Sequence, residues 1–309
     1  MPVKVKPESV RQRVEQLRRV DSQRDQAACE ATCAATSCWA VSAMIGPYPD
    51  LVQIPMPLTV RLRAAAKAGS LHLMASIAVA VATASVTFGL WYPAPFGDLS
   101  KGRDLFWLIV SADVICGPLL TLVLFNPAKP RSALVRDLAL VVFIQLGALG
   151  YGVWTLFHAR PVHLVFEVDR FRVVSVADID PSQLGKAPIE LQQLPWTGPT
   201  LIGARRSKTQ QELLQSIESA LGGVDIAMQP ARWVAFDTVR PDVIAKSVPL
   251  AEFIRRKPDA LAALETAVRQ AGRPIQDLRA LPVVSRFSSW TALIDETGEP
   301  VAFAAVDTY

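Results

Sequence analysis

The middle of the chain carries three long apolar segments. They cover residues 70–92, 105–125 and 138–158, about 20 residues each, which is the length of helix needed to cross the hydrocarbon core of a bilayer. Stretches such as MASIAVAVATASVTF lack the polar stripe that a helix packed on a soluble core shows at the helical period. We therefore expect three transmembrane spans, and the alternative is that they are core helices of a soluble α protein.

The pattern from about residue 159 onward alternates strand and helix signals. HLVFEVDRFRVVSVADI and RWVAFDTV are strand candidates, and WTALIDETGEPVAFAAV has two alternating runs around a turn at Gly298, as in a hairpin. Helices are expected over QQELLQSIESAL, which closes at Gly222, and over LAEFIRRKPDALAALETAVRQAG, which breaks near Pro258. The sequence predicts a membrane protein in which a three-helix transmembrane bundle is followed by an α+β domain.

Composition and charge agree with this division. Of the 309 residues, 51% are hydrophobic, and the mean hydropathy is +0.28, which is high for a soluble enzyme of this size. Residues 1–158 contain 15 Lys and Arg against 10 Asp and Glu, whereas residues 159–309 contain 17 against 18. Because the predicted folded domain has no surplus of basic residues, no nucleic-acid partner is expected.

Basic residues near the ends of the spans predict the orientation. Six lie on one side of the predicted bundle: Arg61, Arg63, Lys67, Lys129, Arg131 and Arg136. The other side holds fewer: Lys101, Arg103, Arg160, Arg170 and Arg172. This bias places the amino terminus in the cytoplasm. In a bacterium with two membranes, the spans would lie in the inner membrane and the carboxyl domain would be periplasmic.

The first 55 residues follow a different pattern. A charged stretch, VKVKPESVRQRVEQLRRVDSQRDQ, precedes an Ala- and Cys-bearing one, and the order of features in a signal peptide is missing. We expect residues 1–55 to be a poorly ordered extension or translated upstream sequence, with a native start near Met56. The predicted organisation is an extension over 1–55, a transmembrane domain over 56–158 and a periplasmic domain over 159–309.

Few residues suggest catalytic or metal chemistry. Cys29, Cys33 and Cys38 have no histidine within 30 residues, so a zinc site would need a ligand from elsewhere. Cys116 is expected in the core of the second span, and His158 at the interfacial end of the third. The sequence has no G-x-S-x-G, H-E-x-x-H or phosphate-binding glycine motif. We predict no catalytic residue, no metal, no cofactor and no enzyme activity.

An aspartate and a Gly-Pro pair lie inside the second predicted span. Asp113 in mid-membrane costs about 2.5–3.5 kcal/mol unless it is compensated. Gly117 and Pro118, one turn later, permit a kink. Asp113 is either protonated or bound to a donor on Ser111, Thr121 or Gln145. The group is a candidate docking contact for a partner's membrane segment, and the alternative is a packed polar contact inside the bundle.

Small residues recur at four-residue spacing in the spans. Ser76, Ala80 and Ala84 do so in the first, and Ala148 and Gly152 in the third. This arrangement lets helices approach closely. It is a candidate partner-binding face, or it holds the three spans together.

Several of these stretches resemble a known family. LHLMASIAVAVATASVTFGLWYPAPF, DVICGPLLTLVLFNPAKP, ARPVHLVFEVDRF and LPWTGPTLIGARR are similar to the TfpX/TfpZ family of type IV pilin accessory proteins, over a region from about Arg61 to the carboxyl end. The resemblance implies an inner-membrane, chaperone-like protein that assists a cognate type IV pilin in stability or assembly. Its expected partners are the pilin subunit, the lipid bilayer and other pilus assembly components. A membrane-tethered periplasmic enzyme and a membrane sensor are the alternative functions.

Overall fold

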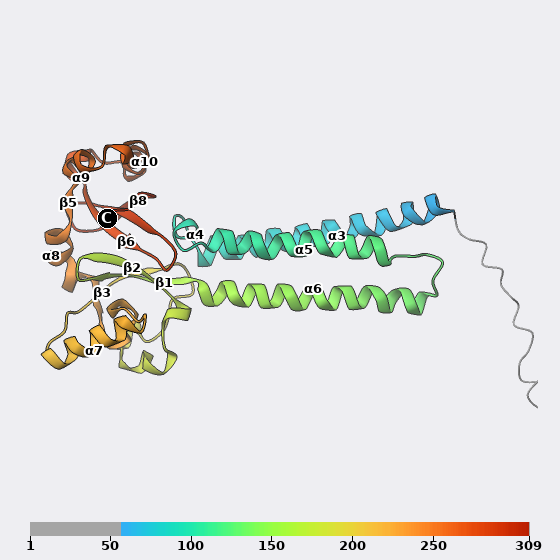
Figure 1. Ribbon diagram of the computed structural model, residues 1–309, viewed down its shortest axis with the longest axis horizontal. Helices are drawn as coiled ribbons and strands as arrows, with labels where there is room; N and C mark the ends of the chain where they lie inside the picture. Colours follow the sequence, from blue (N-terminus) through green and yellow to red (C-terminus); the bar gives the residue numbers. More distant parts are fainter. Residues whose placement is uncertain (1–56, 309) are drawn as a thin grey trace, which may run out of the picture. The chain divides into compact units, whose positions relative to one another are not determined.

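A computed structural model describes residues 57–308, and its most extended elements are three helices that lie side by side (Figure 1). They are α3 (Leu58–Val86), which continues as a π-helical turn over Thr87–Trp91, α5 (Gly102–Leu124) and α6 (Arg131–Ala159). By length and composition, each is able to cross a membrane. The expected bundle of three apolar helices is therefore present.

Two of these helices begin earlier than the apolar pattern indicated. α3 starts at Leu58 and α6 at Arg131, so each carries basic residues in additional turns at one end. Arg and Lys are good helix formers, and their long side chains can reach out of an apolar layer to water. The apolar run therefore marks the part of each helix suited to lipid, and the helix itself is longer.

After α6 the chain forms one mixed sheet. Its eight strands are β1 (Pro161–Glu167), β2 (Arg170–Ser175), β3 (Thr200–Ala204), β4 (Trp233–Ala235), β5 (Val248–Pro249), β6 (Arg279–Val284), β7 (Ser289–Ile294) and β8 (Pro300–Ala304). The order is β4-β3-β1-β2-β6-β7-β8, with β5 also paired to β6. Strand β1 is parallel to β3, and β2 is parallel to β6, whereas the other pairs are antiparallel. Because β1 is central, all seven of its residues are buried.

Helices pack around this sheet. They are α4 (Phe96–Leu99), α7 (Gln210–Leu221), α8 (Phe236–Lys246), α9 (Leu250–Arg256) and α10 (Leu261–Ala271). Short 3-10 turns cover Val176–Asp178, Pro181–Lys186, Ile189–Leu191, Ile226–Met228, Pro230–Arg232, Pro258–Ala260 and Ile275–Asp277. The expected α+β class is confirmed, including the helix over QQELLQSIESAL, the break near Pro258 and the hairpin β7–β8 with Gly298 in its turn.

The connection between the first two long helices enters the core of the sheet domain. Phe96 and Leu99 of α4 belong to the buried cluster that also contains Phe171 of β2 and Val243 of α8. The hydroxyls of two serines, Ser285 and Ser288, both donate to the Leu99 carbonyl oxygen over 2.7 Å. The stretch WYPAPFGD, which connects the first two long helices, is thus a structural joint between the bundle and the sheet.

Two local predictions are wrong. The strand candidate RWVAFDTV is a strand only over β4, because Phe236, Val239 and Val243 repeat at helical spacing and place the buried face of α8 on the core. Cys116 is exposed on the outer surface of α5 rather than in the bundle core. Its neighbour Gly117 faces inward, and successive helical residues point in different directions.

The expectations for the first 55 residues concern a part of the chain outside the described residues. This applies to the proposed extension and to the residues considered for metal binding, Cys29, Cys33 and Cys38.

Candidate functional site

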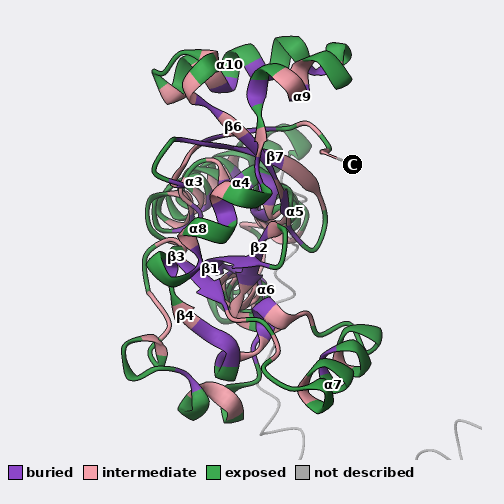
Figure 2. Ribbon diagram, turned by 90° about the vertical axis from the view of Figure 1, so that its left-hand side faces the viewer, coloured by how far each residue is buried: buried purple, intermediate pink, exposed green. Residues whose placement is uncertain are grey.

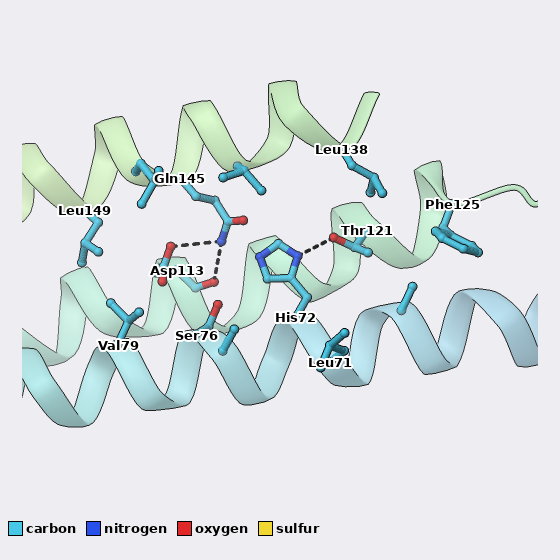
Figure 3. Close-up of a pocket in the computed structure, with 14 residues that line it drawn as sticks. Leu71, His72, Ser76, Val79, Asp113, Thr121, Phe125, Leu138, Gln145 and Leu149 are labelled. Carbon is cyan, nitrogen blue, oxygen red and sulfur yellow. Dashed lines mark hydrogen bonds between the residues drawn. The ribbon is translucent and has the colours of Figure 1, made fainter. Parts of the chain in front are cut away.

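A groove opens along the bundle between α3 and α6, with α5 at its floor (Figure 3). Its volume is about 510 Å³, and it extends from Ala68 to Val79 on α3 and from Leu138 to Leu149 on α6. Both walls therefore run for about three helical turns, or roughly 16 Å. The groove is lined by Ala68, Leu71, His72, Ala75, Ser76, Val79, Asp113, Thr121, Phe125, Leu138, Val142, Gln145, Leu146 and Leu149.

The three helices converge at the end that meets the sheet domain. A buried cluster there contains Tyr92, Phe106, Val110 and Leu156, with Ala80 and Ala84 of α3 packed against it. The Tyr92 hydroxyl donates to the Leu156 carbonyl over 3.0 Å. Helix α5 packs against both of the other long helices, and at this end the rings of Trp91 and Phe157 also meet, 5.3 Å apart. Further along the bundle the groove lies between α3 and α6.

The floor of the groove is polar at its centre. The Nε2 amide of Gln145 on α6 donates to the Oδ1 carboxylate oxygen of Asp113 on α5 over 3.0 Å, and lies 3.2 Å from the Asp113 carbonyl. The Oε1 atom of Gln145 is buried and has no hydrogen-bond partner among the described residues. The half-buried carboxylate of Asp113 therefore places a hydrogen-bond acceptor inside an otherwise apolar groove.

A second polar pair lies beside the first. The Nδ1 atom of His72 on α3 and the Oγ1 hydroxyl of Thr121 on α5 are 2.6 Å apart. Figure 3 shows the His72 ring between the two long walls, with Ser76 one turn along the same helix. Polar side chains from all three helices thus meet in one stretch of the floor.

Packing explains why residue 117 of the Gly-Pro pair in α5 is a glycine. A Cβ atom on Gly117 would lie 2.0 Å from Nε2 of Gln145, so only glycine leaves room for the amide to reach Asp113. Pro118 lies within α5, where it cannot donate the usual backbone hydrogen bond to the carbonyl one turn back. Of the residues that interrupt the apolar pattern of the second span, Asp113 lines the groove and Gly117 leaves room for the Gln145 side chain that binds it.

The six residues proposed from sequence as partner-binding lie in different places. Asp113 and Ser76 line the groove, and Gly117 makes room for Gln145. Ala80 and Ala84 instead pack inside the bundle, so the helices of this chain use the small-residue face themselves. Pro118 lies beside Gly117 in α5.

Of the three donors considered for Asp113, the structure selects one. Gln145 donates to Asp113, whereas Thr121 pairs with His72, and the Ser111 hydroxyl donates to the Leu108 carbonyl. His72 was missed as a groove residue. Its position in an apolar segment was the available signal, because a polar side chain in a span usually faces other helices.

The sheet domain contains a buried histidine that packs against other residues of the domain core. His163 of β1 is 1% exposed, its Nδ1 atom is 2.7 Å from the Thr200 hydroxyl, and its ring packs edge-on against Trp233. Burial lowers the pKa of His163 to about 4, so the ring is neutral at pH 7. Within residues 57–308, no three His, Cys, Asp or Glu side chains are grouped so that they could hold a metal ion.

The fold and the groove define a class of protein: three membrane-capable helices with a lateral groove, joined to a mixed-sheet domain. Residues 60–101 match the family model described as fimbrial assembly protein FimB. The chain is 36% identical over 251 residues to the serogroup I fimbrial assembly protein of Dichelobacter nodosus, a match that covers 81% of this chain and 98% of the relative. The chain belongs to the fimbrial assembly protein family.

Two further relatives come from the same organism. The serogroup E1 fimbrial assembly protein is 35% identical over 251 residues, with 81% of this chain and 98% of the relative covered. The fimbrial assembly protein of serogroups C1 and C2 is 42% identical over 127 residues, or 41% of this chain and 97% of that protein. No solved structure matches the chain. The fimbrial part of the expected resemblance is confirmed, and the narrower TfpX/TfpZ assignment stays a prediction.

Proposed function

We propose that the protein is an inner-membrane accessory protein that assists a cognate type IV pilin in stability or assembly. Membership of the fimbrial assembly family supports the process, and the three apolar helices support the membrane location. The surplus of basic residues at one end of the helices supports an orientation with the amino terminus in the cytoplasm and the sheet domain in the periplasm.

The observation that carries the proposal is the groove between α3 and α6. Its walls are apolar, and Ala68, Ala75 and Ser76 on α3 are small enough for another helix to approach closely. The carboxylate of Asp113, which lines the groove, can receive a hydrogen bond from a polar group on that helix. In this proposal the apolar helix of the pilin lies in the groove while the subunit waits in the membrane.

The sheet domain is fixed where the bundle ends. In addition to the α4 joint, the backbone N–H of Gly198 donates to the Leu90 carbonyl over 2.8 Å, and the rings of Phe157 on α6 and Trp196 are 5.5 Å apart. A domain held in this way lies beside any partner segment that extends from the groove past this end of the bundle. It would contact the head of the pilin, and the protein would act by holding its partner rather than by catalysis.

Gene deletion followed by complementation tests the proposal. We expect deletion to lower the amount of pilin and of surface pili, and the wild-type gene to restore both. The variant Val142→Trp places a large side chain in the groove and should fail to restore them. Phe143→Trp is the matched control, because Phe143 is on the same helix but is not a lining residue of the groove and is 77% exposed. Unchanged piliation after deletion would contradict the proposed function.

A reporter fused to the carboxyl end tests the orientation separately. A reporter that is active only in the periplasm should show activity when it follows Tyr309, and a reporter that is active only in the cytoplasm should not. The reverse result would place the sheet domain on the wrong side of the membrane for contact with a pilin head.

A further inference from the structure

Helix α7 of the sheet domain turns its polar side to the domain and its apolar side outward, the opposite of an ordinary surface helix. Its polar residues Glu212 and Ser216 face the domain, and Ser216 is buried. Its large apolar residues face outward and are between 49% and 86% exposed: Leu213, Leu214, Ile217 and Leu221. We call these four side chains the α7 face. Figure 2 shows the helix mostly in the colour of exposed residues.

A network of charged groups fixes this orientation. The guanidinium of Arg232, which is 4% exposed, donates to the Ser216 hydroxyl over 2.6 Å and pairs with the Glu212 carboxylate at 3.3 Å. Arg205 donates to the same carboxylate over 2.8 Å, and this bond, with the backbone N–H of Lys208, lowers the pKa of Glu212 to about 2. The apolar side is therefore held outward by specific contacts on the polar side.

The α7 face has the pattern of a recognition helix. An amphipathic helix normally buries its apolar side, and a contiguous apolar patch left on a surface usually marks an interaction site. Leu213, Ile217 and Leu221 are four residues apart, which is the spacing by which a helix anchors itself against a complementary surface. The face thus suits a protein partner with an apolar patch.

Basic side chains lie at the start of the same helix. A depression of about 460 Å³ there is lined by apolar Val168 and Leu213 and by Arg206 and Lys208. Arg206 forms one ion pair, with Asp242 at 3.5 Å, and both side chains are more than half exposed. These basic side chains favour a partner that has carboxylates beside the part of its apolar patch that meets the start of the helix.

The size and position of the α7 face favour a tethered partner over a second copy of the chain or the lipid surface. A stable dimer buries about 800 Å² on each side from 20–30 residues, and four side chains on a 12-residue helix fall short of that. Figure 1 places α7 away from the end of the sheet domain at which the long helices enter, so it is not beside the lipid. A face this small suffices for a partner that is already tethered by a second contact, because tethering raises the effective concentration.

We propose that the α7 face docks onto the head of the pilin whose helix lies in the groove, against an apolar patch bordered by carboxylates. This inference rests on the proposed function, since the groove supplies the tether. It assigns the partner contact of the sheet domain to one helix.

Photo-crosslinking in cells that express the full chain and its cognate pilin tests this contact. A photoreactive amino acid is placed at Leu214 on the α7 face, at Gln215 on the same helix, and at Val142 in the groove. We expect crosslinks to pilin from Leu214 and Val142 and none from Gln215. A pilin crosslink from Val142 alone overturns the α7 contact and leaves the proposed function intact, whereas no pilin crosslink at either position contradicts both.

Crosslinks from Leu214 to molecules other than pilin also test the α7 contact. A crosslink to a second copy of the chain, or to lipid, in place of pilin overturns the inference in favour of dimerisation or membrane contact. In a parallel measurement, Leu214→Glu should lower the pilin recovered with the solubilised protein about tenfold, a loss of about 1.4 kcal/mol. Gln215→Glu adds the same charge beside the face and should leave recovery unchanged. Circular dichroism of both variants checks that the fold is kept.

Discussion

The side-chain amide of Gln145 on α6 donates to the carboxylate of Asp113 on α5 over 3.0 Å, across a glycine that leaves it room. This contact explains why an aspartate and a glycine stand at these positions of an apolar span. It also puts hydrogen-bonding groups on the floor of a groove that faces the lipid, where a polar group without a partner is costly.

Adding one methyl group to Gly117 should disrupt this contact. In Gly117→Ala the new Cβ would lie 2.0 Å from the Gln145 amide, so the side chain must move. We expect a loss of about 0.6–2 kcal/mol in unfolding free energy, the range of an interhelical hydrogen bond in membranes, because the amide avoids the new methyl group only by leaving Asp113. Gly147→Ala on α6 is the control, because no other described residue comes within 4 Å of the place its methyl group would take, and it should be neutral or stabilising. Equal effects at both positions would contradict the steric role of Gly117.

For the stability of the bundle, the hydrogen-bond acceptor of Asp113 should matter more than its negative charge. Asp113→Asn keeps an oxygen for the Gln145 amide, whereas Asp113→Leu leaves that amide without its partner. We expect the leucine variant to lose about 0.6–2 kcal/mol relative to the asparagine variant in detergent unfolding, the range of interhelical hydrogen bonds in membranes. Pilin recovery should follow the same order. A stable, fully active Asp113→Leu protein would show that the polar floor is dispensable.

Because the connection between the first two spans packs in the core of the sheet domain, a truncated side chain in this connection should strongly lower the stability of the protein. Leu99 is fully buried in the core of the sheet domain, so Leu99→Ala should cost about 2–5 kcal/mol and lower the thermal midpoint. Leu108→Ala is the control, since Leu108 is 69% exposed on α5. If both variants unfold at the wild-type temperature, the connection is a loop rather than a part of the core.

The buried His163 should make the sheet domain sensitive to acid. Its pKa is lowered by burial from the ordinary 6.5 to about 4, so the unfolded chain binds a proton in this interval and the folded chain does not. Stability is therefore full above about pH 6.5 and falls by up to about 3 kcal/mol as the pH drops to about 4. His163→Gln should flatten this part of a urea-unfolding series. An unchanged slope in the variant would contradict the assignment.

The sequence predicts the elements of this fold better than their assembly. Long apolar runs specify the three spans, and alternation around Gly298 specifies the last hairpin, because both signals are local. The strand candidate beginning at Arg232 failed, since tertiary burial of Phe236 and Val239 on one side of a helix outweighed their strand propensity.

The groove and the α7 face lay beyond sequence reasoning for a different reason. The pattern locates Asp113 in a span, but it does not show that α3 and α6 both pack on α5 and leave space between them. An amphipathic pattern such as that of α7 normally predicts a buried apolar side. Only the contacts of Arg232 with Glu212 and Ser216 reveal that this helix is turned the other way.

A crosslinking scan along α6 tests most directly whether the groove holds the pilin's helix. Photoreactive residues are placed one at a time at three groove positions, Val142, Leu146 and Leu149, and at three exposed positions off the groove, Leu140, Phe143 and Ile144. We expect pilin crosslinks from the first three positions and none from the others, so that labelling follows the period of the helix. Uniform labelling around α6, or labelling confined to the second set, would contradict it.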